Sequence, residues 1–494
     1  MSCATRGLAG VPVTIEADVA NGLPNFTIVG LTDRAIQEAR ERVRAAVRNG
    51  GFDFPQRRLT VNLAPAEVPK EGSGFDLGIA IAVLRAGGMA ISLAGTAFLG
   101  ELALDGGLRP VAGVLPMARC LARAGYCRLV VPSENAGEAA LVDGVEVYGA
   151  PTLGACVRHL EGSEPLPVAS AMAEPRADTV SEADLADIRG QGQAKRALEI
   201  AAAGGHNLLM TGPPGAGKTM LAQAFGSLLP DLEPDEALEV GAIYSLRGAF
   251  RERSFMALRP PLRAPHHSVS RAGLVGGGSG LAQPGEISLA HRGVLFLDEL
   301  CEFPRTHLEA LRQPLEERKV TVVRARGAVS YPADFTLIAA ANPCPCGHLG
   351  DQRGCNCSPR QLADYQSRLS GPIRDRIDLA VSVPRQHYHT LFDGSEEESS
   401  AAVRSRVDSA RGRQRERGRL LNAALQGRRI LADARMSAAA TRLLGRSGER
   451  LHLSARAFYR VIRVARTIAD LAGEDRVGEP AVAEALRYRM EVGA

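Results

Sequence analysis

The chain has 494 residues, of which 45% are hydrophobic and 23% are charged, and its formal net charge is +4. A chain of this length is too long for one hydrophobic core and predicts two or three domains, and its composition is typical of a soluble globular protein. No apolar run is long enough for a transmembrane helix, and the N-terminus lacks the apolar region of a signal peptide, so we expect a cytoplasmic protein with no membrane partner. The small net charge does not by itself indicate an anionic partner.

The first third of the chain alternates between strand and helix patterns. Strand-like apolar runs occur at 26–31, 58–65 and 128–132, and helical patterns at 33–50 and 76–88. This alternation predicts a compact α/β domain over residues 1–162. A segment rich in Pro, Ala and acidic residues follows, and we place a linker at 163–183.

A second alternation of strands and helices follows the linker. Its apolar runs are continuous, at 206–212, 293–299 and 334–342. Continuous runs are typical of parallel strands covered on both faces, so we expect an α/β domain with a parallel sheet over 184–392. Residues 393–494 read as helical throughout, which predicts a helical C-terminal domain. The predicted fold class is α/β.

The segment GPPGAGKT fits the P-loop pattern G-x-x-x-x-G-K-[ST] and lies between a predicted strand and a predicted helix. Its glycines let backbone N–H groups close around phosphate oxygens, while Lys218 neutralises the terminal phosphates and the Thr219 hydroxyl is a ligand for Mg²⁺. A chance glycine-rich turn is the alternative, which this context disfavours. The predicted ATP-binding residues are Gly212, Pro213, Pro214, Gly215, Ala216, Gly217, Lys218 and Thr219.

Asp298 and Glu299 end the apolar run GVLFLDE. Taken alone, such a pair is more typical of a helix N-cap. Beside a P-loop it is typical of an ATPase, in which Asp298 holds Mg²⁺ through water and Glu299 polarises the attacking water. The two motifs together predict an ATPase that uses ATP and Mg²⁺.

Four of the nine cysteines, Cys344, Cys346, Cys355 and Cys357, have the spacing C-x-C-x8-C-x-C. Four thiolates are enough for a closed tetrahedral Zn²⁺ site, and the Pro, Gly and Asn residues between them favour tight turns. Redox groups and reduced cysteines that only pack are the alternatives. A cytoplasmic setting disfavours stable disulfides.

Residues 318–335 alternate like a β-hairpin that turns near 325–327. Positive charge on such a loop suits sequence-independent contact with DNA phosphates, although a solvated edge hairpin guarded by charges has the same pattern. The candidate DNA contacts are Arg318, Lys319, Arg324 and Arg326.

Two further basic or polar features have ordinary interpretations. Residues 404–419 hold seven arginines against two acids, which we interpret as the polar face of a helix rather than a DNA surface. His266 and His267 are adjacent and do not share a helical face, so we interpret them as turn or interface residues rather than metal ligands.

The segments DIRGQGQAKRALEIAAAGGHNLLMTGPPGAGKTMLA, PGEISLAHRGVLFLDEL and SGPIRDRIDL resemble the AAA+ ATPases of the magnesium-chelatase-like group, in particular the ComM/YifB type, a competence-associated family of DNA motors. The resemblance extends over nearly all of the chain. It implies an AAA+ P-loop core with a helical lid and self-association into a ring, expected to be a hexamer.

The resemblance also implies roles for single residues. Asn342 corresponds to the sensor-1 residue that orients the attacking water, and Arg376 to the arginine finger that reaches a neighbour's ATP. Arg456 corresponds to sensor 2 in the lid, and Gly190 and Gln191 to the loop beside the adenine.

Three details accompany these roles. For Arg376, a structural ion pair with Asp375 or Asp378 is the alternative. In related motors the hairpin before sensor 1 lines the pore, and an insert between the P-loop helix and the Asp298 strand, here the glycine-rich insert at 258–288, projects toward the channel. Family members often have cysteines at the four cluster positions but not always the full set, so any Zn²⁺ is expected to be structural.

The N-terminal segments 59–84 and 98–139 resemble the Lon-protease catalytic fold, which is ribosomal S5 domain 2-like. Lon-type proteases use a Ser–Lys dyad, and the resemblance puts Gly74 and Leu115 at those two positions. Ser73 and Lys70 are near, but a shift of one residue faces them differently, so we expect no protease activity. We expect a structural or DNA-facing module, with part of a first strand missing.

The leading hypothesis is an ATP-driven ring that promotes branch migration of DNA during recombination and natural transformation. Its expected partner is branched or single-stranded DNA, contacted through the backbone. The alternative is a magnesium-chelatase-like subunit that chaperones metal insertion or remodels a protein partner. The Lon-like domain disfavours that alternative, since chelatase ATPase subunits generally lack one.

Overall fold

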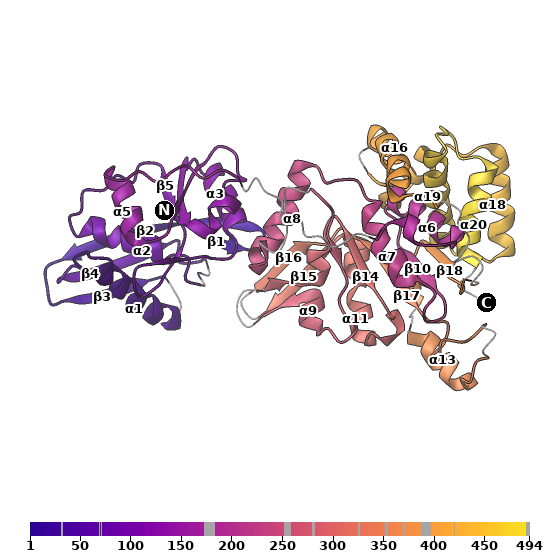
Figure 1. Cartoon of the computed structure of the whole chain (residues 1–494), viewed down its shortest axis with the longest axis horizontal. Coiled ribbons are helices and arrows are strands. Elements are labelled where there is room, and N and C mark those ends of the chain that lie inside the picture. Colours follow the sequence, from indigo (N-terminus) through magenta and orange to yellow (C-terminus); the bar gives the residue numbers. More distant parts are fainter. Residues whose placement is uncertain are drawn as a thin grey trace.

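In the computed structural model, the chain forms three parts in a row (Figure 1): an N-terminal α/β part, a central α/β part and a helical part. The domain border that we expect at 392/393 lies outside the described residues, and the other expected borders stay predictions. The structure describes residues 1–30, 33–68, 70, 72–171, 183–250, 258–278, 282–324, 327–350, 354–368, 371–386, 397–418 and 420–490.

The N-terminal part contains the elements β1 (Ser2–Arg6), β2 (Ala9–Ala20), β3 (Asn25–Val29), α1 (Asp33–Asn49), β4 (Arg58–Ala64), α2 (Asp76–Ala86), β5 (Thr96–Phe98), β6 (Glu101–Leu102), β7 (Leu108–Arg109), α3 (Val114–Arg123), β8 (Arg128–Pro132), α4 (Ala136–Ala139), β9 (Glu146–Ala150) and α5 (Leu153–Glu161). One sheet has the strand order β1-β2-β4-β3 and a second, parallel sheet the order β5-β8-β9. Strands β3 and β4 bury every second side chain, and the nearly all-buried helix α2 belongs to the same core. The first strand, β1, pairs with β2 along its whole length.

The central part is built on the parallel sheet that the sequence predicts. Its main elements are α6 (Gly192–Gly204), β10 (Leu208–Thr211), α7 (Lys218–Ser227), α8 (Pro234–Arg247), β11 (Leu262–Arg263), β14 (Val294–Leu297), β17 (Thr336–Ala341) and β18 (Leu379–Ser382). The strand order is β11-β14-β17-β10-β18, and all neighbours are parallel. Every residue of β14 and β17 is buried, as expected for strands covered on both faces. Because the strands are parallel, the segments that follow β10, β14 and β17 meet at one edge of the sheet.

Shorter elements extend from this sheet: α9 (Arg271–Val275), β12 (Gly276–Gly277), β13 (Gln283–Pro284), α10 (Glu286–Leu289), α11 (Arg305–Ala310), α12 (Arg312–Glu317), β15 (Lys319–Arg324), β16 (Gly327–Pro332), α13 (Pro359–Arg368) and α14 (Gly371–Arg374). Strands β15 and β16 are antiparallel, with Arg324 opposite Gly327, so the predicted hairpin is present. Its buried face, with Val320, Val322 and Tyr331, packs on the core around β14 and β17.

The helical part, which we call the lid, contains α16 (Ser400–Gly418), α17 (Arg428–Ala434), α18 (Ala438–Arg450), α19 (Ala455–Leu471) and α20 (Glu479–Met490). Helix α19 has a strongly apolar face, which shares one core with α6. The arginines of α16 bind neighbouring groups: Arg406 contacts Glu199, and Arg417 contacts the fully buried Asp470 at 2.6 Å. This agrees with the interpretation of α16 as a polar helix face.

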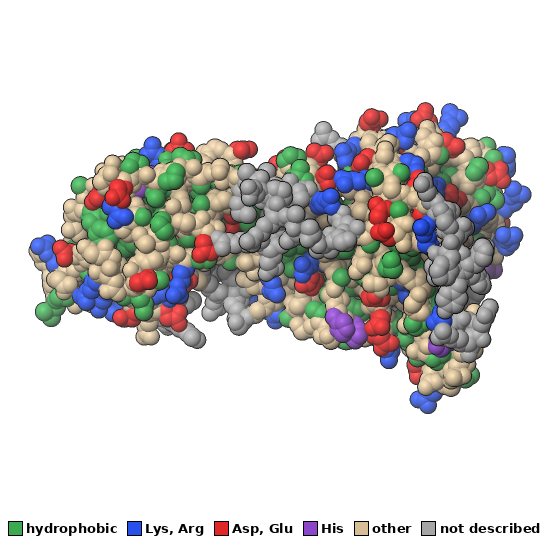
Figure 2. All heavy atoms as spheres, viewed as in Figure 1, with side chains coloured by type: hydrophobic (Ala, Val, Ile, Leu, Met, Phe, Trp, Pro, Cys, Tyr) green, Lys and Arg blue, Asp and Glu red, His purple; other side chains and the backbone are tan. Residues whose placement is uncertain are grey.

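The N-terminal and central parts are joined through α3 and α8. The N–H of Gly113 donates to the carbonyl oxygen of Ser245 (2.9 Å), and the N–H of Leu115 to its hydroxyl (3.3 Å). Acidic and basic side chains are interspersed over the face in Figure 2, in keeping with the small net charge. Within the described ranges, no helix has the length and apolarity that crossing a membrane requires.

Candidate active site

The P-loop lies between the end of β10 and the start of α7. Gly215 and Gly217 have φ values of +76° and +91°, a region that glycine adopts without strain. A Cβ on Gly212 would lie 2.1 Å from the carbonyl oxygen of Val383, so only glycine fits there. The backbone N–H groups at the start of α7, which have no partner within the helix, complete the anion-binding site of the loop.

Lys218 is almost fully buried, and oxygens surround its ammonium group. Nζ donates to the carbonyl oxygens of Gly212 (2.7 Å) and Pro213 (2.9 Å) and to Oδ1 of Asn342 (3.1 Å). Burial lowers the pKa of Lys218, while the two carboxylates after β14 act in the opposite direction. The Lys218 ammonium therefore lies between the P-loop and the residue that follows β17.

Thr219, Asp298 and Glu299 lie together at the same edge of the sheet. The Thr219 hydroxyl donates to Oδ2 of Asp298 (2.7 Å), and the N–H of Glu299 donates to Oδ1 (2.9 Å). A hydroxyl and a carboxylate are oxygen ligands that suit Mg²⁺, which supplies charge neutralisation when bound. Glu299 has φ +50°, a left-handed conformation that is uncommon for a residue other than glycine and is concentrated at functional sites. Its side chain is 52% exposed, so water can reach it.

His267 contacts Glu299, which the sequence interpretation did not foresee. Its Nδ1 lies 3.3 Å from Oε2 of Glu299, and its ring meets the edge of Phe303. Strand register gives a hint of this contact: Arg263 pairs with Leu295, and His267 and Glu299 stand four residues further along each chain segment, beyond the ends of both strands. The interpretation of His267 as a turn or interface residue stays a prediction, and its partner within the chain is the candidate catalytic carboxylate.

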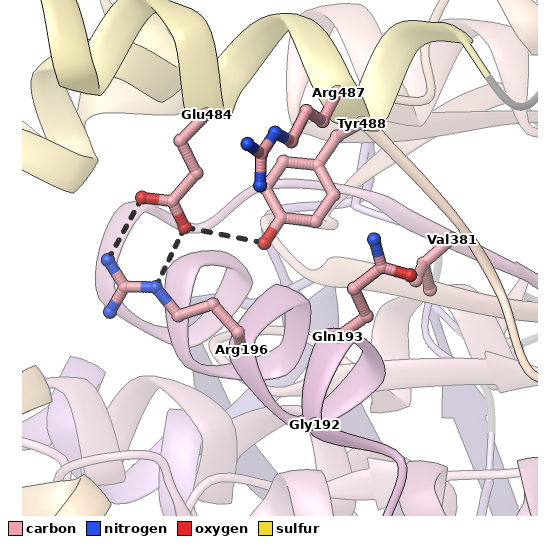
Figure 3. Close-up of a pocket in the computed structure, with 7 residues that line it drawn as sticks. All are labelled: Gly192, Gln193, Arg196, Val381, Glu484, Arg487 and Tyr488. Atoms are coloured by element: carbon pink, nitrogen blue, oxygen red, sulfur yellow. Dashed lines mark hydrogen bonds and ion pairs between the residues drawn. The ribbon is translucent and has the colours of Figure 1, made fainter.

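Gly190 and Gln191 lie beside the P-loop. Gln191 Nε2 donates to the carbonyl oxygens of Ala216 (3.1 Å) and Pro384 (2.7 Å), while the N–H of Gly190 donates to Glu397 (2.7 Å). The next residues border a pocket of about 240 Å³ between α6 and α20. Its lining residues are Gly192, Gln193, Arg196, Val381, Glu484, Arg487 and Tyr488 (Figure 3).

Side chains of α6 and α20 line the pocket in Figure 3. Arg487 and Tyr488 extend into it from α20 and provide a guanidinium and an aromatic face suited to stacking. An ion pair between Arg196 of α6 and Glu484 of α20 (2.9 Å) closes one side and links the lid to the core.

Arg376 and Arg456 lie away from this edge. The main-chain oxygen of Arg376 accepts from Nδ2 of Asn207 (2.8 Å), the residue before β10, whereas the P-loop follows β10. The Arg376 guanidinium contacts Glu316, and Arg456 approaches the same carboxylate at 3.7 Å. The two arginines therefore share a carboxylate at the sheet edge opposite the P-loop.

The hairpin residues differ in their surroundings. Arg318 forms a two-oxygen ion pair with Asp334 (2.8 and 2.9 Å), and Lys319 lies 3.6 Å from Glu317. Arg324 is exposed near the tip, and a Cβ on Gly277 of the glycine-rich insert would lie 2.3 Å from its guanidinium. Arg326 lies outside the described residues. The hairpin tip and the insert are thus in contact.

The four clustered cysteines converge. One ligand atom from each of Cys344, Cys346, Cys355 and Cys357 lies within 4.8 Å of the others. The Sγ–Sγ distances are 3.3 Å for Cys344–Cys346, 3.6 Å for Cys346–Cys355 and 3.7 Å for Cys344–Cys355. Hydrogen bonds from the backbone N–H groups of His348 and Asn356 lower the pKa of Cys346 to about 6. This set of sulfurs can hold one metal ion.

The Lon-like positions of the N-terminal part hold Gly74, which precedes α2, and the fully buried Leu115. The nearby Ser73 hydroxyl donates to Glu101, whereas the Lys70 ammonium donates to the carbonyl oxygens of Pro65 and Val68. Ser73 and Lys70 are thus held by different partners.

Comparison with known proteins places this geometry in a family. The chain is 48% identical to a protein of Mycobacterium tuberculosis (99% of this chain, 98% of the relative) and 46% identical to the competence protein ComM of Haemophilus influenzae (99% and 97%). It is 44% identical to YifB of Escherichia coli (98% and 96%). The chain belongs to the magnesium-chelatase-like ComM/YifB family.

Family models and a more distant relative agree with this membership. The models described as magnesium chelatase subunit ChlI match residues 184–391 and 15–135, and the ChlI C-terminal model matches 397–489. Lon protease 2 of Bacillus subtilis is 28% identical over 199 residues, or 36% of this chain and 36% of that protease. Membership of the ComM/YifB family supports an ATPase-type site that takes ATP and Mg²⁺.

Proposed function

We propose that this ComM/YifB-family chain is an ATP-hydrolysing motor that works as a ring, expected to be a hexamer, on branched or single-stranded DNA. The observation that carries this proposal is the separation of two half-sites. A P-loop with its carboxylates lies at one edge of the sheet, and Arg376 lies at the other.

The residues at the P-loop edge have separate roles in ATP hydrolysis. The loop glycines and Lys218 would bind phosphates, while Thr219 and Asp298 would hold Mg²⁺. Glu299 accepts a proton from the attacking water, and Asn342 keeps both that water and Lys218 in place. Gly190, Gln191 and the pocket in Figure 3 take the adenine side of the nucleotide.

Arg376 and Arg456 act on the ATP of a neighbouring subunit in this proposal. Glu316 binds both guanidinium groups in the isolated chain, and a neighbour's triphosphate would replace that carboxylate. Added positive charge at the transferring phosphoryl group then stabilises the transition state.

DNA as the substrate rests on the competence name of the Haemophilus relative and on the hairpin. The exposed Arg324 at the hairpin tip contacts the glycine-rich insert, so a phosphate bound at one of these two elements would lie close to the other. Arg318 is engaged with Asp334 and Lys319 lies 3.6 Å from Glu317, so Arg324 is the strongest candidate among the described hairpin residues. Branch migration during recombination and natural transformation, in the cytoplasm, is the proposed role.

The test is the ATPase rate without DNA and with single-stranded, duplex and forked DNA, combined with movement of a labelled three-way junction. We expect stimulation by forked DNA and ATP-dependent junction movement. A rate that no DNA changes, with a static junction, would remove the DNA motor and leave only an ATPase.

A second candidate function follows from the ChlI descriptions of the matching family models. The chain would then use ATP to chaperone metal insertion or to remodel a protein partner. Specific capture of a porphyrin-binding protein, together with an ATPase rate insensitive to DNA, would favour this function.

Two finer proposals complete the description. We propose that the cysteine cluster holds a structural Zn²⁺, because a Zn–S bond of about 2.3 Å requires tetrahedral S–S distances of about 3.8 Å. The observed distances of 3.3 to 3.7 Å are close to this value. We also propose that the N-terminal part is a Lon-like module without protease activity, which the absence of casein cleavage would support.

A further inference from the structure

The cysteine cluster lies directly against the P-loop. Gly347, between the first and second cysteine pairs, has φ +80°, and a Cβ on it would lie 2.5 Å from Cδ and 2.8 Å from Cγ of Pro214. The backbone of Gly347 therefore packs on the proline ring with no room for a side chain. On its other side, the carbonyl oxygen of Pro214 accepts from Arg385 (3.2 Å). The third residue of the phosphate-binding loop is thus held by the cluster segment.

A second connection joins the same two segments. Cys344 stands two residues after Asn342, whose side chain accepts a hydrogen bond from Lys218. The cluster therefore begins at one contact with the P-loop and continues to another, at Gly347.

Side-chain packing gives this segment little support of its own. Among its described residues, Cys344 is buried, while Leu349 is 39% exposed, and Gly347, Gly350 and Gly354 have positive φ values. The N–H groups of Leu349 and Cys357 point at the sulfurs of Cys344 (3.3 Å) and Cys355 (3.5 Å). Such a segment is organised around its sulfurs, and a bound metal joins all four of them.

We propose that the metal-loaded cysteine cluster supports the P-loop in its phosphate-binding conformation, so that loss of the metal weakens ATP binding. This inference rests on the Zn²⁺ site and the ATP site proposed above. The metal is structural and takes no part in hydrolysis. Its effect reaches the nucleotide through the contact of Gly347 with Pro214 and through Asn342.

The first test removes two ligands. The full-length double variant C355S/C357S is compared with wild type and with C127S, which changes an exposed cysteine outside the cluster. We expect one Zn²⁺ per chain in wild type and C127S and none in the double variant, by elemental analysis. We expect the Kd for a fluorescent ATP analogue to rise about tenfold or more in the double variant only. Far-UV circular dichroism checks that all three proteins are folded.

The second test leaves the metal site intact and changes the contact. Gly347→Ala puts a methyl group against Pro214. Gly350→Ala places alanine at the same φ of +80°, but its methyl group has no neighbouring atom within 4 Å. Both variants should bind Co²⁺ with the absorption of tetrahedral thiolate coordination. Gly347→Ala should weaken ATP binding, and Gly350→Ala should not.

The possible outcomes distinguish a failure of this inference from a failure of the Zn²⁺-site and ATP-site proposals on which it rests. A folded, metal-free double variant with wild-type ATP affinity would overturn the coupling and leave the ATP site standing. Wild-type protein that holds no metal would overturn both the Zn²⁺ site and the coupling. Equal ATP affinity in the two glycine variants would remove the Gly347 contact as the route.

Discussion

The placement of Arg376 leads to a sharp prediction about mixed subunits. Lys218→Ala removes the phosphate-binding ammonium from the P-loop, and Arg376→Ala removes the guanidinium at the opposite edge of the sheet. Each variant alone should be nearly inactive, because an arginine finger contributes about a thousandfold or more to the rate.

The main chain of Arg376 and the P-loop lie at opposite ends of β10, so we expect that one chain does not complete its own site. Asn207 donates a hydrogen bond to the main chain of Arg376 and precedes β10. The P-loop follows β10. The four residues of β10 span about 13 Å at about 3.3 Å per residue, whereas a transition-state contact needs about 3 Å. A subunit that lacks Lys218 can still lend its Arg376 to a neighbour. In rings assembled at random from equal amounts of both variants, about one interface in four has both groups intact.

The assay is steady-state ATP hydrolysis of the mixture after co-assembly, with each variant alone at the same total concentration. Activity near one quarter of the wild-type rate is expected if the two groups act across an interface. A mixture as inactive as its components, although co-purification through a tag on one variant shows mixed rings, would refute the assignment of Arg376 to a neighbour's ATP.

Three further predictions concern single side chains. Glu299→Gln should retain ATP binding but lower kcat about a hundredfold or more, because the general base is lost; normal turnover would exclude Glu299 from the chemistry. His267→Ala should lower kcat about two- to fivefold at constant KM, since a half-exposed contact contributes at most about 1 kcal/mol; the matched variant His266→Ala should not, and equal rates would leave His267 without a positioning role. His291, whose Nε2 lies 3.1 Å from Oε2 of Glu239, lowers the pKa of this carboxyl to about 2 together with Arg292, so its stabilisation is present above the ordinary value of 4.5 and is lost as pH falls toward 2. Thermal unfolding of Glu239→Gln should show a lower midpoint than wild type near neutral pH and a difference that vanishes in acid; a constant difference would contradict this.

The sequence predicts the parts of the site that depend on local pattern. The P-loop, the carboxylates after β14 and the hairpin follow from motif spacing and strand alternation, and the structure contains each element. Parallel strands then bring Lys218 and Asn342 together, because β17 lies next to β10.

Contacts that depend on packing between distant segments were beyond the sequence. Glu316 is in contact with the Arg376 guanidinium, a partner beyond the alternatives Asp375 and Asp378 that the sequence offers, because α12 ends near the start of β18 in space and not in sequence. The contact of Gly347 with Pro214 cannot be predicted from the sequence either, because a glycine in a glycine-rich loop does not indicate which residue packs against it.

In the proposed ring, the lid would provide a route by which one ATP site influences the next. Arg460 of α19 is only 3% exposed and donates to the main-chain oxygens of Arg374 (3.4 Å) and Ile377 (2.9 Å), on either side of Arg376. Arg456 stands one turn earlier on the same helix. In the proposed ring, a rotation of α19 would therefore move Arg376 and Arg456 together relative to the neighbouring subunit. Because α20 of the same lid borders the pocket beside the P-loop, closure of the lid on a nucleotide in its own subunit would shift the arginines presented to the next one.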